Sequence, residues 1–456
     1  MKGIGAPRAT ELRADFERVL QVLRNSETVD KTLSVPYEEF QRRQRAVQSA
    51  LADKGIDVGF VFSDEHYDGD VPYLGGNTNI SIEQVAGLIG PGGFHILAGL
   101  EGGYVSEQLA SRSGAKVHKV EMLKLADENY PIEAESLDEI IEEAAGKKPR
   151  SIGLLTPRQV LPASICESLQ DRYGSDGVID AQEIYYRIKY EKSDIEMQLI
   201  RDANIIADAM MRAMLAVLRP GQLETQVAGW AYWVAKELGS EENGWDVMVT
   251  ANTANRTLIG KALNRVIQLG DYVHLGVAPK RDGLASCIRR SAIAVGDPSD
   301  VTPDQRFWFD FVKEAYDVGF DAYVKVARGR RPAREQEQAL VDYFARRGPD
   351  VSSRLGHSVD LVRLKPYTGT HNAGYTECQE FFGAITLDSE EPLGDQIVTM
   401  LDVAIRGIAN KWDDVVIPGM DFVVIENTLG KFHERVETFN KVPNLVQSLV
   451  GRGGEA

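Results

Sequence analysis

The sequence has 456 residues, which is long enough for two domains that each bury a hydrophobic core. Its hydrophobic fraction of 43% and charged fraction of 26% are ordinary for a globular protein and exclude a disordered or fibrous chain. The net charge of -17 argues against non-specific nucleic-acid binding, because clustered Lys and Arg hold a phosphate backbone.

The cysteines and the first residues of the sequence indicate in which cellular compartment the protein is expected. Cys166, Cys287 and Cys378 are widely spaced and form no CxxC pair, so we expect neither a disulfide framework nor a structural zinc site. This pattern indicates the reducing cytoplasm. The first residues lack a basic-then-apolar signal, and no apolar run approaches the length of a membrane span. We therefore expect neither export nor membrane anchoring.

Residues 1–34 are predicted to form a helical extension. Apolar residues recur there at helical spacing in a charged stretch, which is typical of an amphipathic helix. They are Leu12, Phe16, Val19, Leu20 and Leu23. We expect this helix to pack on its own domain or on a partner subunit.

Helical and strand patterns alternate over residues 35–190, which predicts a small α/β domain. The predicted elements are helices 37–54 and 137–145 and strands 58–63, 84–89, 94–100 and 151–155. At the end of this domain, Ser193 and Glu196 have the spacing of a capping box, which opens a long helix. A second domain, residues 191–456, is therefore predicted to begin here.

A hairpin is predicted in the second domain, between two pairs of helices. Strands 272–278 and 284–295 flank a polar turn at 280–283 that contains glycine. The alternation of side chains along the second strand places Cys287 and Arg289 on the same face. Helices are predicted from 193 to a stop at Pro220-Gly221, and at 223–238, 303–326 and 334–347, so the helix–helix–strand order occurs twice.

Several motifs resemble those of the creatinase/prolidase superfamily, which has the pita-bread fold. The hairpin resembles its signature hairpin, and the later matches are the Gly-His motif at 356–358, the Glu-Pro strand at 400–403 and the Glu-Asp-Thr strand at 424–428. The resemblance covers the chain from about residue 35 to the end. It implies an α/β N-terminal domain, an α+β pita-bread catalytic domain and a homodimer.

Two aspartates bind a dinuclear metal centre in the metallopeptidase members, and Gly276 and Cys287 hold their places here. The chain is in this respect similar to creatinase, which hydrolyses a C–N bond without a metal. It departs from creatinase at residues 252–257, which contain no histidine where creatinase has its catalytic one, and at Arg289, which replaces a substrate-binding carboxylate. A positive group there suits an anionic substrate.

The resemblance implies a metal-independent, creatinase-like hydrolase that needs no cofactor and cleaves a C–N bond of a small, carboxylate-bearing molecule. His357 is the predicted proton shuttle, because imidazole exchanges protons near neutral pH. Asp402 and Glu426 are the predicted acid–base or substrate-orienting pair, because two close carboxyls shift the pKa of one upward. Arg289 is the predicted anion clamp. Further substrate-binding candidates are Cys287, His371, Asn77 and Asn79.

Other interpretations remain open. The carboxylates could form salt bridges with a nearby arginine, and Cys287 could be a buried space-filling residue. Together, Cys287, His357, Asp402 and Glu426 could hold a single metal ion. A lyase that abstracts a proton next to a carboxylate and a non-catalytic binding protein are the alternative functions.

Overall fold

The computed structural model describes residues 6–81, 83–125, 133–251, 260–365, 369–376, 382–409, 411, 413–445 and 449. The chain divides into two compact units. The small unit comprises residues 34–191 and 374–382, and the large unit comprises residues 1–33, 192–373 and 383–456. None of the helices in the described ranges is both long and apolar enough to cross a membrane.

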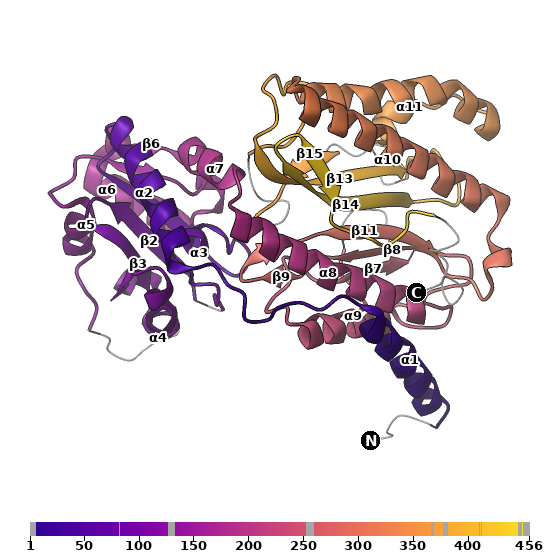
Figure 1. The fold of residues 1–456 in the computed structure, drawn as a ribbon, viewed down its shortest axis with the longest axis horizontal. Helices are drawn as coiled ribbons and strands as arrows, with labels where there is room; N and C mark the ends of the chain where they lie inside the picture. The colour runs from indigo at the N-terminus through magenta and orange to yellow at the C-terminus, as the bar shows by residue number, and fades with distance from the viewer. Residues whose placement is uncertain are drawn as a thin grey trace. The chain divides into compact units, whose positions relative to one another are not determined.

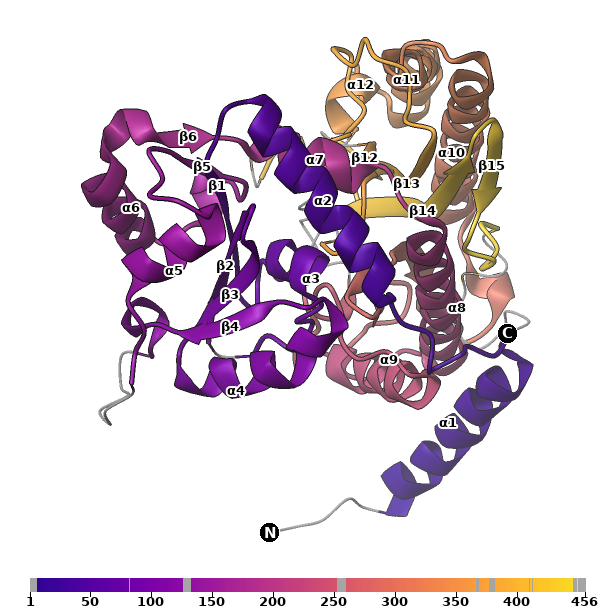
Figure 2. The same ribbon diagram turned by 60° about the vertical axis from the view of Figure 1, so that its left-hand side comes forward.

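The small unit is an α/β domain built on a mixed sheet with the strand order β4-β3-β2-β1-β5-β6 (Figure 2). The strands β1, β2 and β3 are antiparallel neighbours, whereas β4, β5 and β6 add in parallel. Its strands are β1 (Val58–Ser63), β2 (Val85–Gly90), β3 (Gly93–Ala98), β4 (Lys116–Lys119), β5 (Ile152–Leu154) and β6 (Val178–Asp180). Its helices are α2 (Tyr37–Asp53), α3 (Asp70–Gly75), α4 (Leu100–Leu109), α5 (Leu137–Ala145), α6 (Ala163–Gly177) and α7 (Gln182–Tyr190).

The large unit has a curved antiparallel sheet with the order β12-β13-β14-β11-β8-β7, and β15 pairs with β14. The longer strands are β7 (Met248–Ala251), β8 (Tyr272–Val277), β11 (Ile288–Ile293), β12 (Thr370–Asn372), β13 (Gln396–Arg406), β14 (Phe422–Phe432) and β15 (Arg435–Thr438). The helices are α1 (Ala6–Asn25), α8 (Asp194–Val217), α9 (Glu224–Leu238), α10 (Pro303–Gly329), α11 (Arg334–Leu355) and α12 (Leu361–Leu364). Figure 1 shows α10 and α11 along β13 and β14, and α8 and α9 along β7, β8 and β11.

The predicted hairpin is present, with a short two-stranded extension. Strands β9 (Lys280–Arg281) and β10 (Leu284–Ala285) pair at its tip. Asp282 and Gly283 connect them with φ angles of 49° and 79°. An Asp-Gly pair suits such a two-residue turn because both positions require positive φ. The turn therefore sets the register in which β8 faces β11.

The predicted N-terminal helix is α1, and it packs on α8 of its own chain. Val19 lies in the same hydrophobic cluster as residues of α8 and α9. Asp15 is fully buried, and Arg219 binds its two carboxylate oxygens at 2.8 and 3.0 Å. Residues 1–33 thus form part of the large unit. The predicted capping box is also present, since the backbone N–H of Ser193 donates to Glu196 at 2.8 Å.

We predict that Gly407→Ala strongly destabilises the large unit. A Cβ at Gly407, just after β13, would overlap the carbonyl oxygen of Met420, and this backbone is fixed by the hydrogen bond from the N–H of Gly407 to Asp421 (2.9 Å). We expect urea unfolding to report a loss of about 3 kcal/mol or more. The control Gly229→Ala on α9 meets no atom within 4 Å and should raise stability slightly, by up to about 1 kcal/mol. Equal stability of the two variants would contradict this account of the packing.

Candidate functional site

A row of residues crosses four neighbouring strands of the large sheet. Gly276 on β8 lies opposite Arg289 on β11. Arg289 lies opposite Glu426 on β14, which lies opposite Asp402 on β13. Residues opposite one another on antiparallel strands project to the same face. Ile425 projects to the other face and joins the hydrophobic cluster beneath α10 and α11, so the row stands on the face away from the helices.

Arg289 binds both carboxylates of this row. Its Nε donates to Glu426 and its terminal nitrogen donates to Asp402. The exposed fractions are 6% for Arg289, 3% for Asp402 and 0% for Glu426. A buried carboxylate requires a nearby counter-charge, which the guanidinium supplies to both. The salt bridge considered as an alternative to acid–base chemistry is therefore present.

The electrostatics of Glu426 follow from this contact. Burial alone would raise the pKa of its carboxyl, but the charge of Arg289 and the hydrogen bond with His371 outweigh burial and lower the pKa to about 2. Glu426 is therefore ionised at neutral pH. We expected two close carboxyls to push one pKa upward; for Glu426 the shift is downward because a cation bridges the pair.

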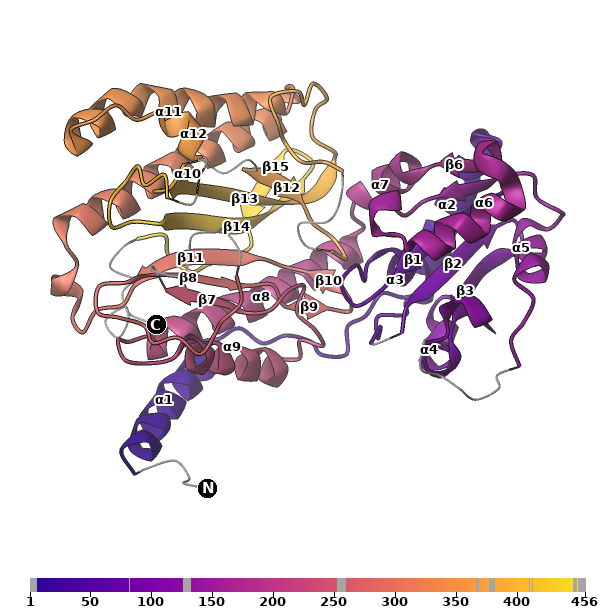
Figure 3. The same cartoon turned by 180° about the vertical axis from the view of Figure 1, so that it is seen from behind.

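His371 completes the cluster from β12, the strand next to β13 (Figure 3). Its Nε2 lies 3.3 Å from Oε1 of Glu426, and its Nδ1 lies 3.4 Å from the carbonyl oxygen of Asn372. His371 is 8% exposed. A carboxylate that accepts the N–H of one ring nitrogen orients an imidazole and favours the tautomer with a lone pair on the other.

The row does not fit the dinuclear metal centre of the metallopeptidase members. Gly276 offers no ligand, and a Cβ there would lie 3.0 Å from both the Arg289 side chain and the Trp245 ring. The two carboxylates that could bind a metal are both bound to a guanidinium, whose positive charge would repel a cation. Cys287, at the other predicted aspartate position, is 1% exposed, and its backbone carbonyl accepts a hydrogen bond from Thr428.

Other predicted site residues lie elsewhere. His357, the predicted proton shuttle, is exposed just after α11, and its ring nitrogens face the carbonyl oxygens of Leu355 and Val416 at 3.2 and 3.0 Å. The histidine beside Glu426 is thus His371. In the small unit, Asn77 is buried and donates to Ser106 at 2.9 Å, whereas Asn79 is exposed. Segment 252–257 and Cys378 lie outside the described residues.

His274 on β8 was not among the residues predicted for the site. It is fully buried beneath Phe422, with ring centroids 5.3 Å apart, and neither ring nitrogen has a hydrogen-bond partner among the described residues. Burial, and then the charge of Arg289, lower its pKa to about 3, so the ring is neutral. Its position two residues before Gly276, on the same face of the strand, was the available signal.

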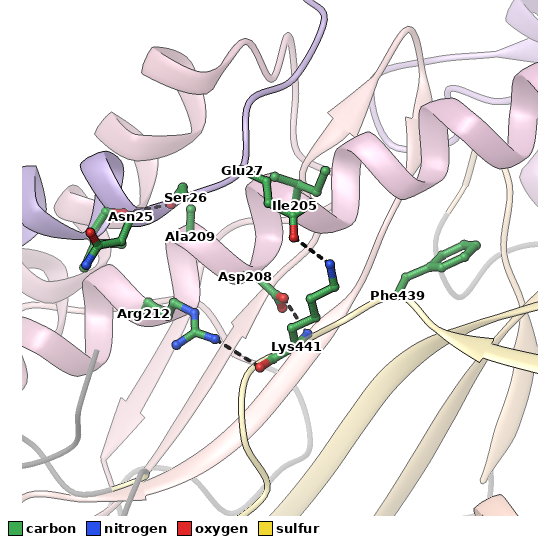
Figure 4. A pocket seen from close by; sticks show the side chains of 10 residues that line it. Asn25, Ser26, Glu27, Ile205, Asp208, Ala209, Arg212, Phe439 and Lys441 are labelled. Atoms are coloured by element: carbon green, nitrogen blue, oxygen red, sulfur yellow. Dashed lines mark hydrogen bonds and ion pairs between the residues drawn. The ribbon is translucent and has the colours of Figure 1, made fainter.

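A separate cavity of about 280 Å³ lies in the large unit between α1, α8 and the segment after β15 (Figure 4). Glu27, Asp208 and Arg212 each contact the side chain or the backbone of Lys441. Lys441 pairs with Glu27 at 2.5 Å, its backbone N–H donates to Asp208, and its carbonyl oxygen accepts from Arg212 at 3.0 Å. These mutual contacts stabilise the packing of α1, so the cavity is a weaker candidate than the Arg289 cluster.

We predict that His274 makes the protein less stable in acid. The unfolded chain binds a proton at this residue below its ordinary pKa of 6.5, whereas the folded protein does so only near pH 3. Stability should fall with decreasing pH in this interval, by up to about 1.4 kcal/mol per pH unit from this residue. Urea unfolding between pH 6.5 and 4.5 should show a shallower slope for His274→Leu than for the control His66→Leu at an exposed site. Identical slopes would contradict the assignment.

Comparisons with known proteins agree with this architecture. The sequence model of metallopeptidase family M24 matches residues 198–380. An Xaa-Pro dipeptidase of Pyrococcus horikoshii is 24% identical over 271 residues, which cover 58% of this chain and 72% of that protein. The uncharacterized peptidase YqhT of Bacillus subtilis is 22% identical over 285 residues, which cover 62% of this chain and 74% of that protein.

These relatives contradict the predicted function. Those named by their activity are peptidases, so the prediction of a metal-independent, creatinase-like hydrolase for a non-peptide C–N bond is wrong. The mistake came from reading the loss of the metal aspartates as a sign of creatinase chemistry. The coarser prediction, an enzyme of the hydrolase class, is supported by the same names.

The fold is also that of solved structures. The X-Pro aminopeptidase of Thermotoga maritima superposes with a TM-score of 0.69 at 15% identity, covering 89% of this chain and 99% of that one. This likeness confirms the predicted two-domain architecture, with an α/β domain before a pita-bread domain. The family match over residues 198–380 and the shared pita-bread fold agree with the resemblance of this chain to the creatinase/prolidase superfamily.

Proposed function

We propose that this chain is a peptidase for short peptides and that its reaction takes place at the cluster of His371, Glu426, Asp402 and Arg289. The observation that carries the proposal is the 3.3 Å contact between Nε2 of His371 and Glu426 on the face of the sheet away from the helices. The names of the relatives, dipeptidase and peptidase, support peptide bonds as the target. His371 also lies within the matched range 198–380.

In this proposal His371 moves the proton. Glu426 accepts the N–H of Nε2, so the lone pair lies on Nδ1. The 3.4 Å contact of Nδ1 with the carbonyl oxygen of Asn372 opens when Nδ1 takes a proton from the water that attacks the peptide carbonyl. The same nitrogen then returns the proton to the departing amine. Glu426 is the weaker base of the two, because the charge of Arg289 and the hydrogen bond with His371 lower its pKa to about 2.

Arg289 acts as a positioning residue. Its ion pairs hold Glu426 and Asp402 in one place, so the imidazole that Glu426 orients is also fixed. Arg289 was predicted to bind an anionic group of the substrate. Its guanidinium already binds two carboxylates, so this proposal gives it no contact with the substrate. No step passes through a metal ion, because the row does not fit one. A homodimer and a cytoplasmic location are further proposals carried from the sequence.

The test is hydrolysis of a panel of dipeptides, including Xaa-Pro substrates, by the full chain. His371→Gln should lower kcat/KM by about 100-fold or more, as expected for loss of a general base. The matched control His357→Gln, at an exposed histidine, should retain activity. Retained activity in His371→Gln would contradict the site assignment, and absence of turnover in the unaltered protein, with and without added Mn²⁺, would contradict the function. Circular dichroism checks that each variant is folded.

A further inference from the structure

Two buried histidines of the small unit face one another across neighbouring parallel strands. Nδ1 of His95 on β3 lies 2.9 Å from Nε2 of His118 on β4. Their exposed fractions are 0% and 7%. The two residues share a face of the sheet because His118 pairs with Leu97, two positions along the strand from His95. The ring planes differ by only 13°.

Two glutamates complete this arrangement. Glu143, on α5, lies near both histidines. One possible ligand atom from each of His95, His118 and Glu143 lies within 4.8 Å of the other two. Glu135 contacts the outer nitrogen of His118, Nδ1, at 2.8 Å. An imidazole that donates Nδ1–H to a carboxylate carries its lone pair on Nε2, the nitrogen that faces His95.

The hydrogen bond between the two histidines does not satisfy all of their buried ring nitrogens. A single N–H···N hydrogen bond would join the two rings, yet Nε2 of His95 is buried with no hydrogen-bond partner among the described residues. Buried polar atoms are normally paired. Nδ1 of His95 can therefore serve a ligand by giving up one hydrogen bond. Nε2 forms no hydrogen bond of normal geometry, although the backbone of Gly92 interacts with the ring.

We propose that His95, His118 and Glu143 form a binding site for a divalent transition metal ion of the zinc type, with water in the fourth position. Two imidazoles and a carboxylate are a common ligand set for such ions. Glu135 then orients the ring of His118 through its contact with Nδ1, as carboxylates often do for a metal-ligating histidine. This site lies in the small unit and is independent of the proposed peptidase reaction.

The distances require little movement. With zinc–nitrogen bonds of about 2.0–2.1 Å, two nitrogens on a tetrahedral ion lie about 3.3 Å apart. The observed 2.9 Å would have to open by only a few tenths of an ångström. Burial, and then the proximity of His118, lower the pKa of His95, which favours the neutral imidazole that a metal needs.

Lys116 competes with the metal for Glu143. The two side chains form an ion pair and are 54% and 49% exposed. Exposed ion pairs of this kind contribute little to stability, so a divalent ion should displace the ammonium group. Replacing Lys116 with methionine should consequently tighten metal binding.

The experiment is calorimetric titration of the chelator-treated full chain with Zn²⁺, repeated with Co²⁺, whose visible absorption reports tetrahedral coordination. The unaltered chain should bind one ion at this site, and His118→Gln and Glu143→Gln should each weaken binding by about tenfold or more. Glu135→Gln should weaken it less, and Lys116→Met should strengthen it.

Two control variants identify the site. His371→Gln removes the histidine of the large unit, and His66→Gln removes an exposed histidine of the small unit; both should bind as the unaltered chain does. Unchanged binding in Glu143→Gln, or no binding by the unaltered chain, would overturn the proposal. Because Glu143 is half-exposed, its variant decides the question even if His118→Gln fails to fold.

Discussion

The ion pairs of Arg289 with Asp402 and Glu426 are the interaction on which the centre of the large unit depends. Two carboxylates on neighbouring strands, both almost fully buried, would otherwise repel each other in a medium of low polarity. In the metallopeptidase members that the sequence resembles, metal ions meet this requirement. Here one guanidinium does so, and the absence of a side chain at Gly276 leaves room for its stem.

The neighbouring residue holds this arginine in place. Arg290 projects to the other face, where it donates to the carbonyl oxygen of Glu426 and to the side chain of Asn427, both at 2.6 Å. Although burial lowers its pKa to about 10, Arg290 is still charged at neutral pH. It therefore locks β11 against β14 in the register that sets Arg289 opposite Glu426. Two adjacent arginines thus have different roles, one in the cluster and one in the sheet.

Local signals in the sequence predicted much of the fold. The Ser193 capping box and the Asp282 turn depend on residues close together in the chain, and both are present. The site was harder to predict, because it depends on which distant segments meet. The motif match favoured His357, yet the register of β12 brings His371 to Glu426. The pairing of the small unit's two histidines depends in the same way on the register of parallel strands.

The most direct test of the account is the unfolding free energy of Arg289→Met, measured in urea with and without millimolar Mn²⁺. Methionine keeps much of the length of the side chain and removes its charge, which leaves two buried carboxylates uncompensated. We predict a loss of about 3–5 kcal/mol at neutral pH. Mn²⁺, a cation suited to carboxylate ligands, should restore part of this loss, so that it stabilises the variant more than the unaltered protein. Equal stability of variant and unaltered protein, or equal stabilisation of both by Mn²⁺, would contradict the claim that Arg289 takes the place of the metal.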